Sequence, residues 1–246
     1  MRILVKVGGA QIEEREARAE LVRSVALARA AGLEIVLVHG GGNQIRSLVR
    51  RLGLPERYLV YAGRYDARQD LATLLRALAG LAADGRPVAL PANVPWPPRI
   101  LLVGASPDDR AALARAAARE GVGDALAYAP RLPDARLAAL VRGARAAILP
   151  VLSEAAGFAA IDAIAAGTPV VASAVGALPE LVGAAGILVP PREPERLATA
   201  LHTAWADERV HAQIAGEARS RAAHRRTWAE VADATRRVYA EVGAFD

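Results

Sequence analysis

Short apolar runs alternate with amphipathic stretches along most of the chain, and glycine-containing turns separate the two kinds of segment. The runs are rich in valine, isoleucine and leucine, which is typical of strands that are buried on both faces. In the stretches between them, apolar residues recur every three or four positions, as in amphipathic helices. The alternation therefore predicts a parallel sheet that helices cover on both sides.

The predicted elements form two series. In the first, we expect strands at Ile3–Val7 and Ile35–Val38 and helices at about Glu14–Ala31 and Asn43–Leu52. In the second, we expect strands at Tyr58–Ala62, Ile100–Val103, Ala125–Tyr128, Ala146–Leu149, Pro169–Ser173 and Ile187–Val189. Its helices are expected at Asp70–Ala83, Asp108–Glu120, Asp134–Gly143, Ala159–Ala166 and Leu178–Val182, followed by two or three helical pieces between Glu193 and Val242. The five prolines within Asp84–Pro98 predict an irregular loop.

The two series predict two domains of unequal size. Residues 56–246 contribute six strands, which suffice for one complete doubly wound, Rossmann-like α/β domain. Residues 1–55 form only a small βαβα unit, and about 55 residues are marginal for independent folding. We therefore expect this unit to dock on the larger domain, to dimerise, or to extend the neighbouring sheet.

The amino-acid composition argues against several kinds of site and location. The chain has no cysteine, which excludes disulfides and thiolate metal sites, and its four histidines show no metal-ligand spacing. No apolar stretch of about 18 residues is free of charge, which argues against a membrane span. Lys6 interrupts the first apolar run too early for a signal peptide. We therefore expect no metal site and, by default, a cytoplasmic location.

The basic charge indicates an anionic partner. The net charge is +5 and the pI is about 10.2. Aromatic residues make up only 4% of the chain and do not interleave with the arginines, which argues against nucleic-acid binding. A small anionic ligand and an anionic membrane surface both fit this charge.

Lys6 is the only lysine among 31 lysine and arginine residues, and it stands just before a glycine pair, Gly8 and Gly9. A glycine turn between a strand and a helix offers backbone N–H groups to an anion, and a lysine adds a positive charge. A second turn, H-G-G-G with Gly40 and Gly41, ends the next strand in the same manner. The alternative interpretation is that these glycines only form tight turns.

The two turns resemble those of the amino acid kinase family, whose acetylglutamate kinase-like members carry K-x-G-G and, further on, V-H-G-G-G. In that family the lysine and glycines hold the transferred phosphoryl group, and the second turn lies beside the acyl substrate. The resemblance implies these roles for the residues just named and covers residues 1–55. The family's adenine-binding lobe, catalytic aspartate and second lysine have no counterpart in this chain, so the resemblance implies a fragment.

Four motifs of the second series resemble a different family. They read Y-L-V-Y-A-G-R-Y-D-A-R-Q-D-L, S-E-A-A-G-F-A-A-I-D-A-I-A-A-G-T-P-V-V-A-S, V-G-A-L-P-E-L-V and G-I-L-V-P-P-R-E-P-E-R-L. Their order and spacing resemble the C-terminal, donor-binding half of the GT-B glycosyltransferases of family 4, also called group 1. The resemblance spans about residues 56–240. It implies a nucleoside-diphosphate sugar as donor substrate, transfer with retention, and no obligatory metal or other cofactor.

This resemblance places the diphosphate of the donor at the turn after the first strand of the series, where Gly63 and Arg64 stand. Negative charge grows on the diphosphate as the glycosidic bond breaks, and a fixed positive charge stabilises it. Where the family usually has a further lysine, this chain has the neutral Gln69. Its neighbour Arg68 is an alternative source of charge, although side chains one residue apart diverge by about 100° on an α-helix.

The family's acidic pair corresponds to Glu154 and Asp162. The resemblance implies that Glu154 faces the donor sugar and that Asp162 accepts hydrogen bonds from the ribose hydroxyls. Gly157 and Phe158 lie in the turn before a helix whose N-terminus can face the diphosphate. The backbone that holds the base is implied at Pro130, Arg131 and Leu132.

Three hypotheses result. The first is a glycosyltransferase with Arg64 and Glu154 in catalysis, in which a partner chain or a homo-oligomer supplies the missing acceptor domain. The second is a non-catalytic module that binds a nucleotide sugar, which the neutral Gln69 favours. The third is an amino acid kinase fragment. Structural roles are the competing interpretation of single residues, such as a surface ion pair for Arg64 or a first-turn helix carboxylate for Asp162.

Overall fold

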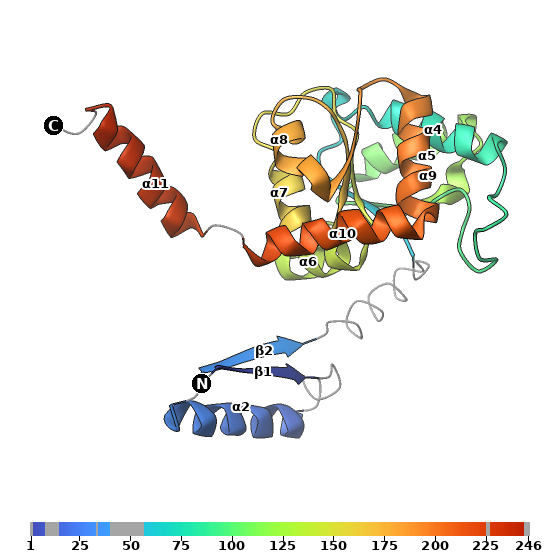
Figure 1. The fold of residues 1–246 in the computed structure, drawn as a ribbon. Coiled ribbons are helices and arrows are strands. Elements are labelled where there is room, and N and C mark those ends of the chain that lie inside the picture. The colour runs from blue at the N-terminus through green and yellow to red at the C-terminus, as the bar shows by residue number, and fades with distance from the viewer. Residues whose placement is uncertain (1, 8–14, 33, 40–56, 225–226, 244–246) are drawn as a thin grey trace.

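The computed structural model describes residues 2–7, 15–32, 34–39, 57–224 and 227–243. These residues form two parallel sheets with their helices, one of two strands and one of six (Figure 1). Among the helices of these residues, none is both long and apolar enough to cross a bilayer.

The two-stranded sheet pairs β1 (Arg2–Val7) with β2 (Glu34–His39), and α2 (Arg15–Ala30) stands between them in the chain. The strands are parallel, and Lys6 lies opposite Val38. The two predicted strands and the first predicted helix of this unit are confirmed. The predicted helix Asn43–Leu52 and the glycine turns with Gly8, Gly9, Gly40 and Gly41 lie outside the described residues.

The six-stranded sheet has the order β5-β4-β3-β6-β7-β8, and all its strands are parallel. They are β3 (Leu59–Ala62), β4 (Ile100–Val103), β5 (Leu126–Ala129), β6 (Ala147–Leu149), β7 (Val170–Ser173) and β8 (Gly186–Val189). Each lies within one residue of its predicted bounds. The predicted doubly wound α/β fold is thereby confirmed.

Helices cover both faces of this sheet. One face carries α4 (Leu71–Ala83), α5 (Pro107–Arg119) and α9 (Pro194–Ala206). The other carries α6 (Asp134–Gly143), α7 (Phe158–Ala165), α8 (Leu178–Val182) and α10 (Glu208–Ala223). With α11 (Trp228–Glu241), the described residues after Glu193 form three helices, within the predicted two or three. The 3₁₀ turns η1 (Ala67–Gln69), η2 (Gly123–Ala125) and η3 (Gly183–Ala185) were not expected.

The strands read as continuous apolar runs because alternate residues enter different cores. Leu59 and Tyr61 belong to the core beneath α4 and α9, whereas Tyr58 and Val60 belong to the core beneath α6 and α7. Each of these four side chains is at most 1% exposed. A sheet buried on both faces needs apolar side chains at every position, not only at every second one.

The strand order reverses between β3 and β6. From β3 the chain moves outward to β4 and β5, then returns to β6 beside β3 and moves outward to β7 and β8. The connections after β3 and β6 therefore leave in opposite directions, which opens a crevice at the carboxyl ends of the strands. In Figure 1, α9 runs downward from this edge of the sheet.

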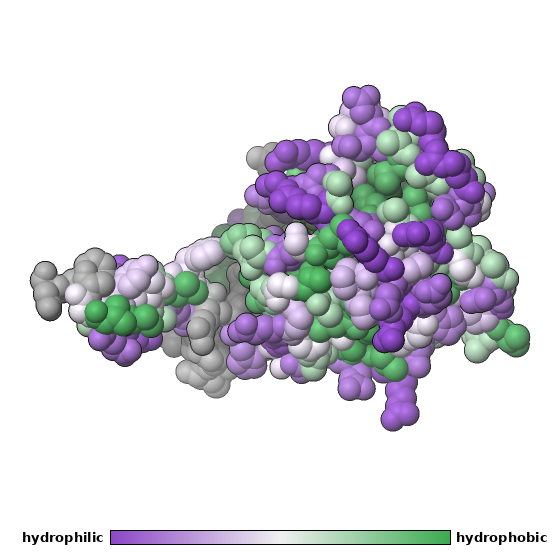
Figure 2. All heavy atoms as spheres, turned by 90° about the horizontal axis from the view of Figure 1, so that it is seen from above, coloured by the Kyte–Doolittle hydropathy of each residue, from purple (hydrophilic) through white to green (hydrophobic). Residues whose placement is uncertain are grey.

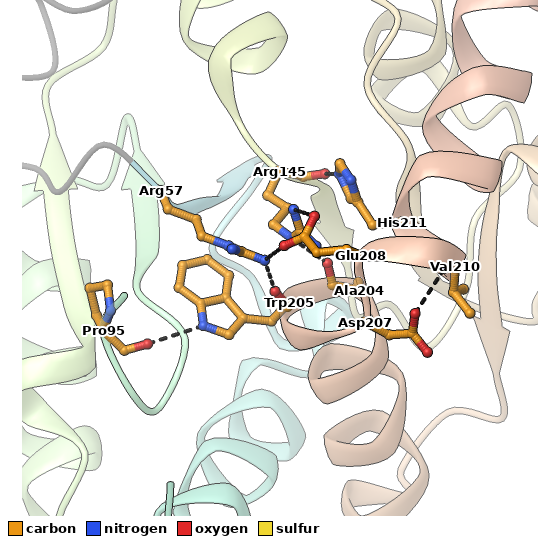
Figure 3. Close-up of polar contacts among 9 residues, drawn as sticks. All are labelled: Arg57, Pro95, Arg145, Ala204, Trp205, Asp207, Glu208, Val210 and His211. Carbon is orange, nitrogen blue, oxygen red and sulfur yellow. Dashed lines mark hydrogen bonds and ion pairs between the residues drawn. The ribbon is translucent and has the colours of Figure 1, made fainter. Parts of the chain in front are cut away.

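A polar network closes the opposite, amino-terminal edge (Figure 3). Arg57 donates to the carbonyl of Trp205 and lies 2.9 Å from Oε1 of Glu208. Arg145 donates from Nε to the carbonyl of Ala204 at 2.7 Å and pairs through Nη1 with Oε2 of Glu208 at 3.2 Å. The network thus ties the starts of β3 and β6 to the junction of α9 and α10.

Burial within the same network lowers the pKa of His211, which belongs to α10. Nε2 of His211 lies 2.9 Å from the carbonyl oxygen of Arg145, so the neutral ring can donate there. Burial lowers the pKa of His211, and the charge of Arg145 lowers it further. Burial alone would raise the pKa of Glu208, but Arg145 and Arg57 outweigh it and hold that pKa below its ordinary value.

We expect the free energy of unfolding to fall as the pH drops below about 6.5, the ordinary pKa of histidine. In that range the unfolded chain binds a proton at His211 that the folded chain does not, and stability is lost until the lowered pKa is reached. A further loss follows below the ordinary glutamate pKa, because folding holds Glu208 in its charged form. Thermal unfolding between about pH 7.5 and 5.5 measures the first loss, which should be shallower in His211→Gln.

The matched control for this experiment is His224→Gln, which changes an exposed histidine at the C-terminal end of α10. It should leave the acid loss as steep as in the wild type. Equal slopes for the wild type and His211→Gln would contradict the assignment.

Candidate functional site

The carboxyl edge of the six-stranded sheet carries a groove made of two adjoining cavities. The first has a volume of about 470 Å³ and lies where β3, β4 and β5 end. Its lining residues are Ala62, Gly63, Arg64, Val103, Gly104, Arg131, Leu132, Asp134 and Leu137. Four of them were predicted as site residues, namely Gly63, Arg64, Arg131 and Leu132.

The second cavity, of about 490 Å³, lies between α6 and α7 over β3 and β6. The predicted site residue Asp162 lines it, together with a floor rich in alanine. Ala62, Asp134 and Leu137 line both cavities, which therefore form one continuous groove. Figure 2 views the molecule from this edge and shows hydrophilic side chains around recessed apolar surface.

Arg64 follows β3 directly, at the point where the strand order reverses. The hydroxyl of the buried Tyr61 donates to the backbone carbonyl of Arg64 and so fixes this turn from beneath. Burial raises the pKa of Tyr61 well above its ordinary value, which keeps the hydroxyl protonated. The Arg64 guanidinium is exposed and forms no hydrogen bond or ion pair within the described residues. It is free to bind an anion.

Arg68 and Gln69, the two residues considered as further ligands of the diphosphate, both contact other residues of β3 or of the turn that follows it. Oδ2 of Asp66 pairs with Nη2 of Arg68 at 2.8 Å, and the hydrogen bonds from Arg68 lower the pKa of Asp66 to about 2. Oε1 of Gln69 lies 3.0 Å from the hydroxyl oxygen of Tyr61. Since this segment is the 3₁₀ turn η1, successive side chains diverge by about 120°, not by the 100° expected for an α-helix. Neither Arg68 nor Gln69 lines the groove.

The loop between β6 and α7 is fastened to its neighbours. The backbone N–H of Leu152 donates to the carbonyl of Arg68 at 2.7 Å. The backbone N–H of Val151 donates to the hydroxyl of the buried Ser173 at 3.0 Å. The first bond holds the two loops on either side of the reversal point against each other, and the second ties the loop after β6 to the end of β7.

Glu154 lies in this loop, and its carboxylate is held by the backbone. Oε1 of Glu154 accepts hydrogen bonds from the N–H groups of Ala156, at 3.2 Å, and Gly157, at 2.9 Å. Gly157 has φ +65 and precedes α7, and a Cβ there would lie 2.3 Å from Cδ1 of Leu181. Phe158 is the first residue of α7 and 60% exposed, whereas the sequence placed it in the turn.

The loop after β5 lines the other end of the groove. Arg131 and Leu132 line the first cavity, and Pro130 precedes them at the end of β5. Gly104 lies opposite, where a Cβ would be 4.0 Å from the Cα of Arg131, and its φ of +81 favours glycine. The Arg131 side chain is exposed and forms no hydrogen bond or ion pair in the described part of the chain, so it too can contact a ligand.

Sequence reasoning missed Gly104, Asp134 and Leu137. Gly104 could have been found, because it directly follows a predicted strand in the same manner as Gly63 does. Asp134 and Leu137 were assigned only to a helix, and nothing local indicates which helix face borders a groove. In the described part of the chain, no three histidine, aspartate or glutamate side chains are grouped to hold a metal ion.

A six-stranded parallel sheet with one reversal of strand order, a glycine turn at that point and an adjoining groove define a Rossmann-like α/β domain. Solved GT-B glycosyltransferases share this fold. Residues 56–207 match the family model described as glycosyl transferases group 1. The chain belongs to this family.

Among curated relatives, the chain is similar to D-inositol 3-phosphate glycosyltransferases. It is 38% identical over 197 residues to that of Streptomyces griseus, covering 77% of this chain and 40% of the relative. It is 35% identical over 236 residues to that of Streptomyces avermitilis, covering 89% of this chain and 49% of the relative. The chain thus spans less than half the length of these relatives.

Among solved structures, the sucrose-phosphate synthase of Thermosynechococcus elongatus matches with a TM-score of 0.63 and 27% identity, over 98% of this chain and 58% of that one. Anabaena Alr3699/HepE in complex with UDP matches with a TM-score of 0.65 and 22% identity, over 86% and 58%. The latter likeness concerns the fold alone. The likeness of residues 1–55 to the amino acid kinase family stays a prediction.

Proposed function

We propose that this chain binds a nucleoside-diphosphate sugar in the groove and acts as the donor-binding half of a glycosyltransferase. The observation that carries the proposal is the unpaired guanidinium of Arg64 at the reversal point, on the rim of the groove. An exposed arginine on a turn fixed from beneath suits a diphosphate, because its planar fork can bind two oxygens at once.

The proposed reaction transfers the glycosyl group with retention. The bond between the anomeric carbon and the diphosphate oxygen breaks, and a bond to the acceptor oxygen forms on the same face. The acceptor proton leaves with the departing diphosphate. Arg64 stabilises the charge that grows on the diphosphate, and Glu154 orients the sugar from the loop before α7.

The acceptor site is proposed to lie outside this chain. The family relatives are about twice as long, and the described domain supplies one groove wall without a facing domain. A partner chain or a second copy of this chain would provide the acceptor. No metal ion is required in this proposal, because arginine supplies the positive charge.

A non-catalytic nucleotide-sugar-binding module is the second candidate. The contacts of Arg68 and Gln69 favour it, since the first is neutralised by Asp66 and the second is neutral. Of the three side chains considered at the turn after β3, only Arg64 then offers an unpaired charge to the leaving group. Such a protein would bind the donor and its nucleoside diphosphate without turning the donor over.

We expect a nucleoside diphosphate to raise the melting temperature of the full chain. At a concentration of about 100 Kd, binding adds about 2.7 kcal/mol to the free energy of unfolding, or roughly 5–10 °C for a domain of this size. Thermal shift and calorimetry with UDP, GDP, ADP, their sugar conjugates and ATP, each with and without Mg²⁺, test this. Release of nucleoside diphosphate from a bound donor would support the enzyme, and binding without release would support the module. No shift with any of these ligands would overturn the proposal, and a shift with ATP alone would favour the kinase fragment.

A further inference from the structure

We infer that Asp70 is a positioning residue of the donor site. Its carboxylate ties the start of α4 to the loop after β8, and this bridge fixes the turn that carries Arg64. The inference rests on the proposed function, because it takes Arg64 as the ligand of the diphosphate. It adds a residue that lies outside both cavities of the groove and acts on the site through Arg64.

The backbone of Asp70 is strained. Among the residues of the described part of the chain that are not glycine, only Asp70, with φ +28, and Arg192, with φ +60, have a positive φ. This region is unfavourable for residues that carry a Cβ, although aspartate tolerates it better than most. Such strain persists only where surrounding contacts stabilise it, and it clusters at functional sites. Glycine would adopt this conformation freely, so the side-chain contacts of Asp70 offset its strain.

The two strained residues contact each other. Oδ2 of Asp70 accepts a hydrogen bond from the backbone N–H of Arg192 at 3.2 Å. Oδ1 of Asp70 accepts a hydrogen bond from the hydroxyl of Thr73 at 2.9 Å, and Thr73 is only 3% exposed. Each carboxylate oxygen therefore has a partner, one on α4 and the other on the loop after β8.

Helix capping does not explain these contacts. Asp70 is the N-cap residue of α4, but its side chain accepts no hydrogen bond from the first backbone N–H groups of that helix, as an ordinary N-cap side chain does. The carboxylate instead reaches Arg192, two residues before α9 begins. Since α4 and α9 pack against each other over the same core, the bridge joins the starts of two neighbouring helices.

The bridge closes the turn that carries Arg64. Residues 63–70 connect β3 to α4, and Asp70 is the last of them. The Tyr61 hydroxyl holds the carbonyl of Arg64 near the start of this turn, and the loop after β6 holds the carbonyl of Arg68 in its middle. Without the bridge, the end of the turn loses its tie to the loop after β8, and the Arg64 guanidinium samples a wider range of positions. Affinity then falls, because a ligand must bring a less ordered side chain into place.

Asp70→Gly and Arg192→Gly form a matched pair of variants. Each relieves the strain of a positive φ, which offsets the greater freedom of glycine in the unfolded chain, so both should melt close to the temperature of the wild type. Only Asp70→Gly removes the bridge, because position 192 contributes its backbone N–H, which glycine retains. Arg192 also lies outside both cavities of the groove.

Calorimetry on the full chain with UDP, GDP and ADP measures the effect. For the nucleotide that the wild type binds most tightly, we expect Asp70→Gly to weaken binding by roughly three- to tenfold, as for the loss of one hydrogen bond. Arg192→Gly should bind it as tightly as the wild type. A purely structural role of Asp70 would change the melting temperature and leave this affinity unaltered.

Asp70→Asn is the conservative variant. Its amide oxygen can accept the hydrogen bond from the N–H of Arg192, while its NH₂ group donates to the Thr73 hydroxyl, which can also act as an acceptor. Asparagine tolerates a positive φ as well. Asp70→Asn should therefore bind the nucleotide nearly as tightly as the wild type. The same loss in Asp70→Asn as in Asp70→Gly would overturn the inference, because the charge and not the bridge would then matter.

A double variant tests whether Asp70 acts through Arg64. In the Arg64→Ala background, Asp70→Gly should cause no further loss of affinity, since the effects of coupled residues are not additive. An equal loss in both backgrounds would overturn the inference and leave the proposed function standing. So would wild-type affinity in Asp70→Gly, or an equal loss in Arg192→Gly. Failure of the wild type to bind any of the three nucleotides would reject the proposed function and the inference with it.

Discussion

Substitution of Gly176 by alanine is expected to destabilise the six-stranded domain by roughly 3 kcal/mol. A Cβ at this position would lie 1.7 Å from the carbonyl oxygen of Glu154 and 2.8 Å from its carbonyl carbon. Both are backbone atoms, which cannot rotate away as the end of a side chain could. The φ of +53 adds the strain that any L-residue meets in the left-handed region.

The position of Gly176 explains why its substitution should affect donor binding as well as stability. Ala177 donates from its backbone N–H to the same carbonyl of Glu154, at 3.3 Å. The loop after β6 and the loop after β7 thus touch through main-chain atoms here. Pushing them apart displaces the carboxylate of Glu154, so binding of a donor should weaken together with the stability.

Thermal unfolding measures the loss, which should lower the melting temperature by roughly 6–12 °C for a domain of this size. Gly216→Ala is the matched control, because Gly216 lies within α10 and a Cβ there meets no atom within 4 Å. That substitution should be neutral or slightly stabilising, since alanine is the better helix former. If Gly176→Ala melted at the temperature of Gly216→Ala, the close approach of the two loops would be wrong.

The strands and helices of the larger domain could be predicted from local patterns in the amino-acid sequence. Runs such as Ile100–Val103 are apolar at every position, and the buried parallel sheet requires this. Glycine after a strand marks the carboxyl edge, and Gly63 with Arg64 indeed borders the groove. The order of the strands also agrees with the doubly wound class, since α/β domains of this type repeat a few arrangements.

Contacts between distant segments could not be predicted in this way. Gly176 is one glycine among 21, and only the fold shows that the backbone of Glu154 lies against it. Arg57 and Glu208 pair across 151 residues. Arg68 was predicted as a candidate phosphate ligand, but its guanidinium pairs with the carboxylate of Asp66, two residues earlier. The type of a residue indicates which interactions it can form. Which partner it meets depends on the fold.

Arg64→Ala is expected to have the largest effect on the proposed function. Affinity for the nucleoside diphosphate should fall by roughly 10- to 100-fold, the range for a hydrogen bond to a charged group. Turnover of the donor should fall by about 10²–10³ further, because the charge on the leaving group develops only as the glycosidic bond breaks. Calorimetry and a continuous assay of nucleoside-diphosphate release measure the two losses separately.

The structure allows this loss of binding to be separated from a loss of folding. The Arg64 side chain is exposed and unpaired in the described residues, so the melting temperature without ligand should not change. Arg136→Ala removes the same charge from an exposed position of α6 outside the groove and should leave affinity unaltered. Arg64→Lys should restore part of the affinity, since lysine keeps the charge but cannot bind two oxygens in a fixed plane. Unchanged affinity in Arg64→Ala would contradict the placement of the diphosphate at the reversal point. The proposed position of the whole donor would then be wrong as well.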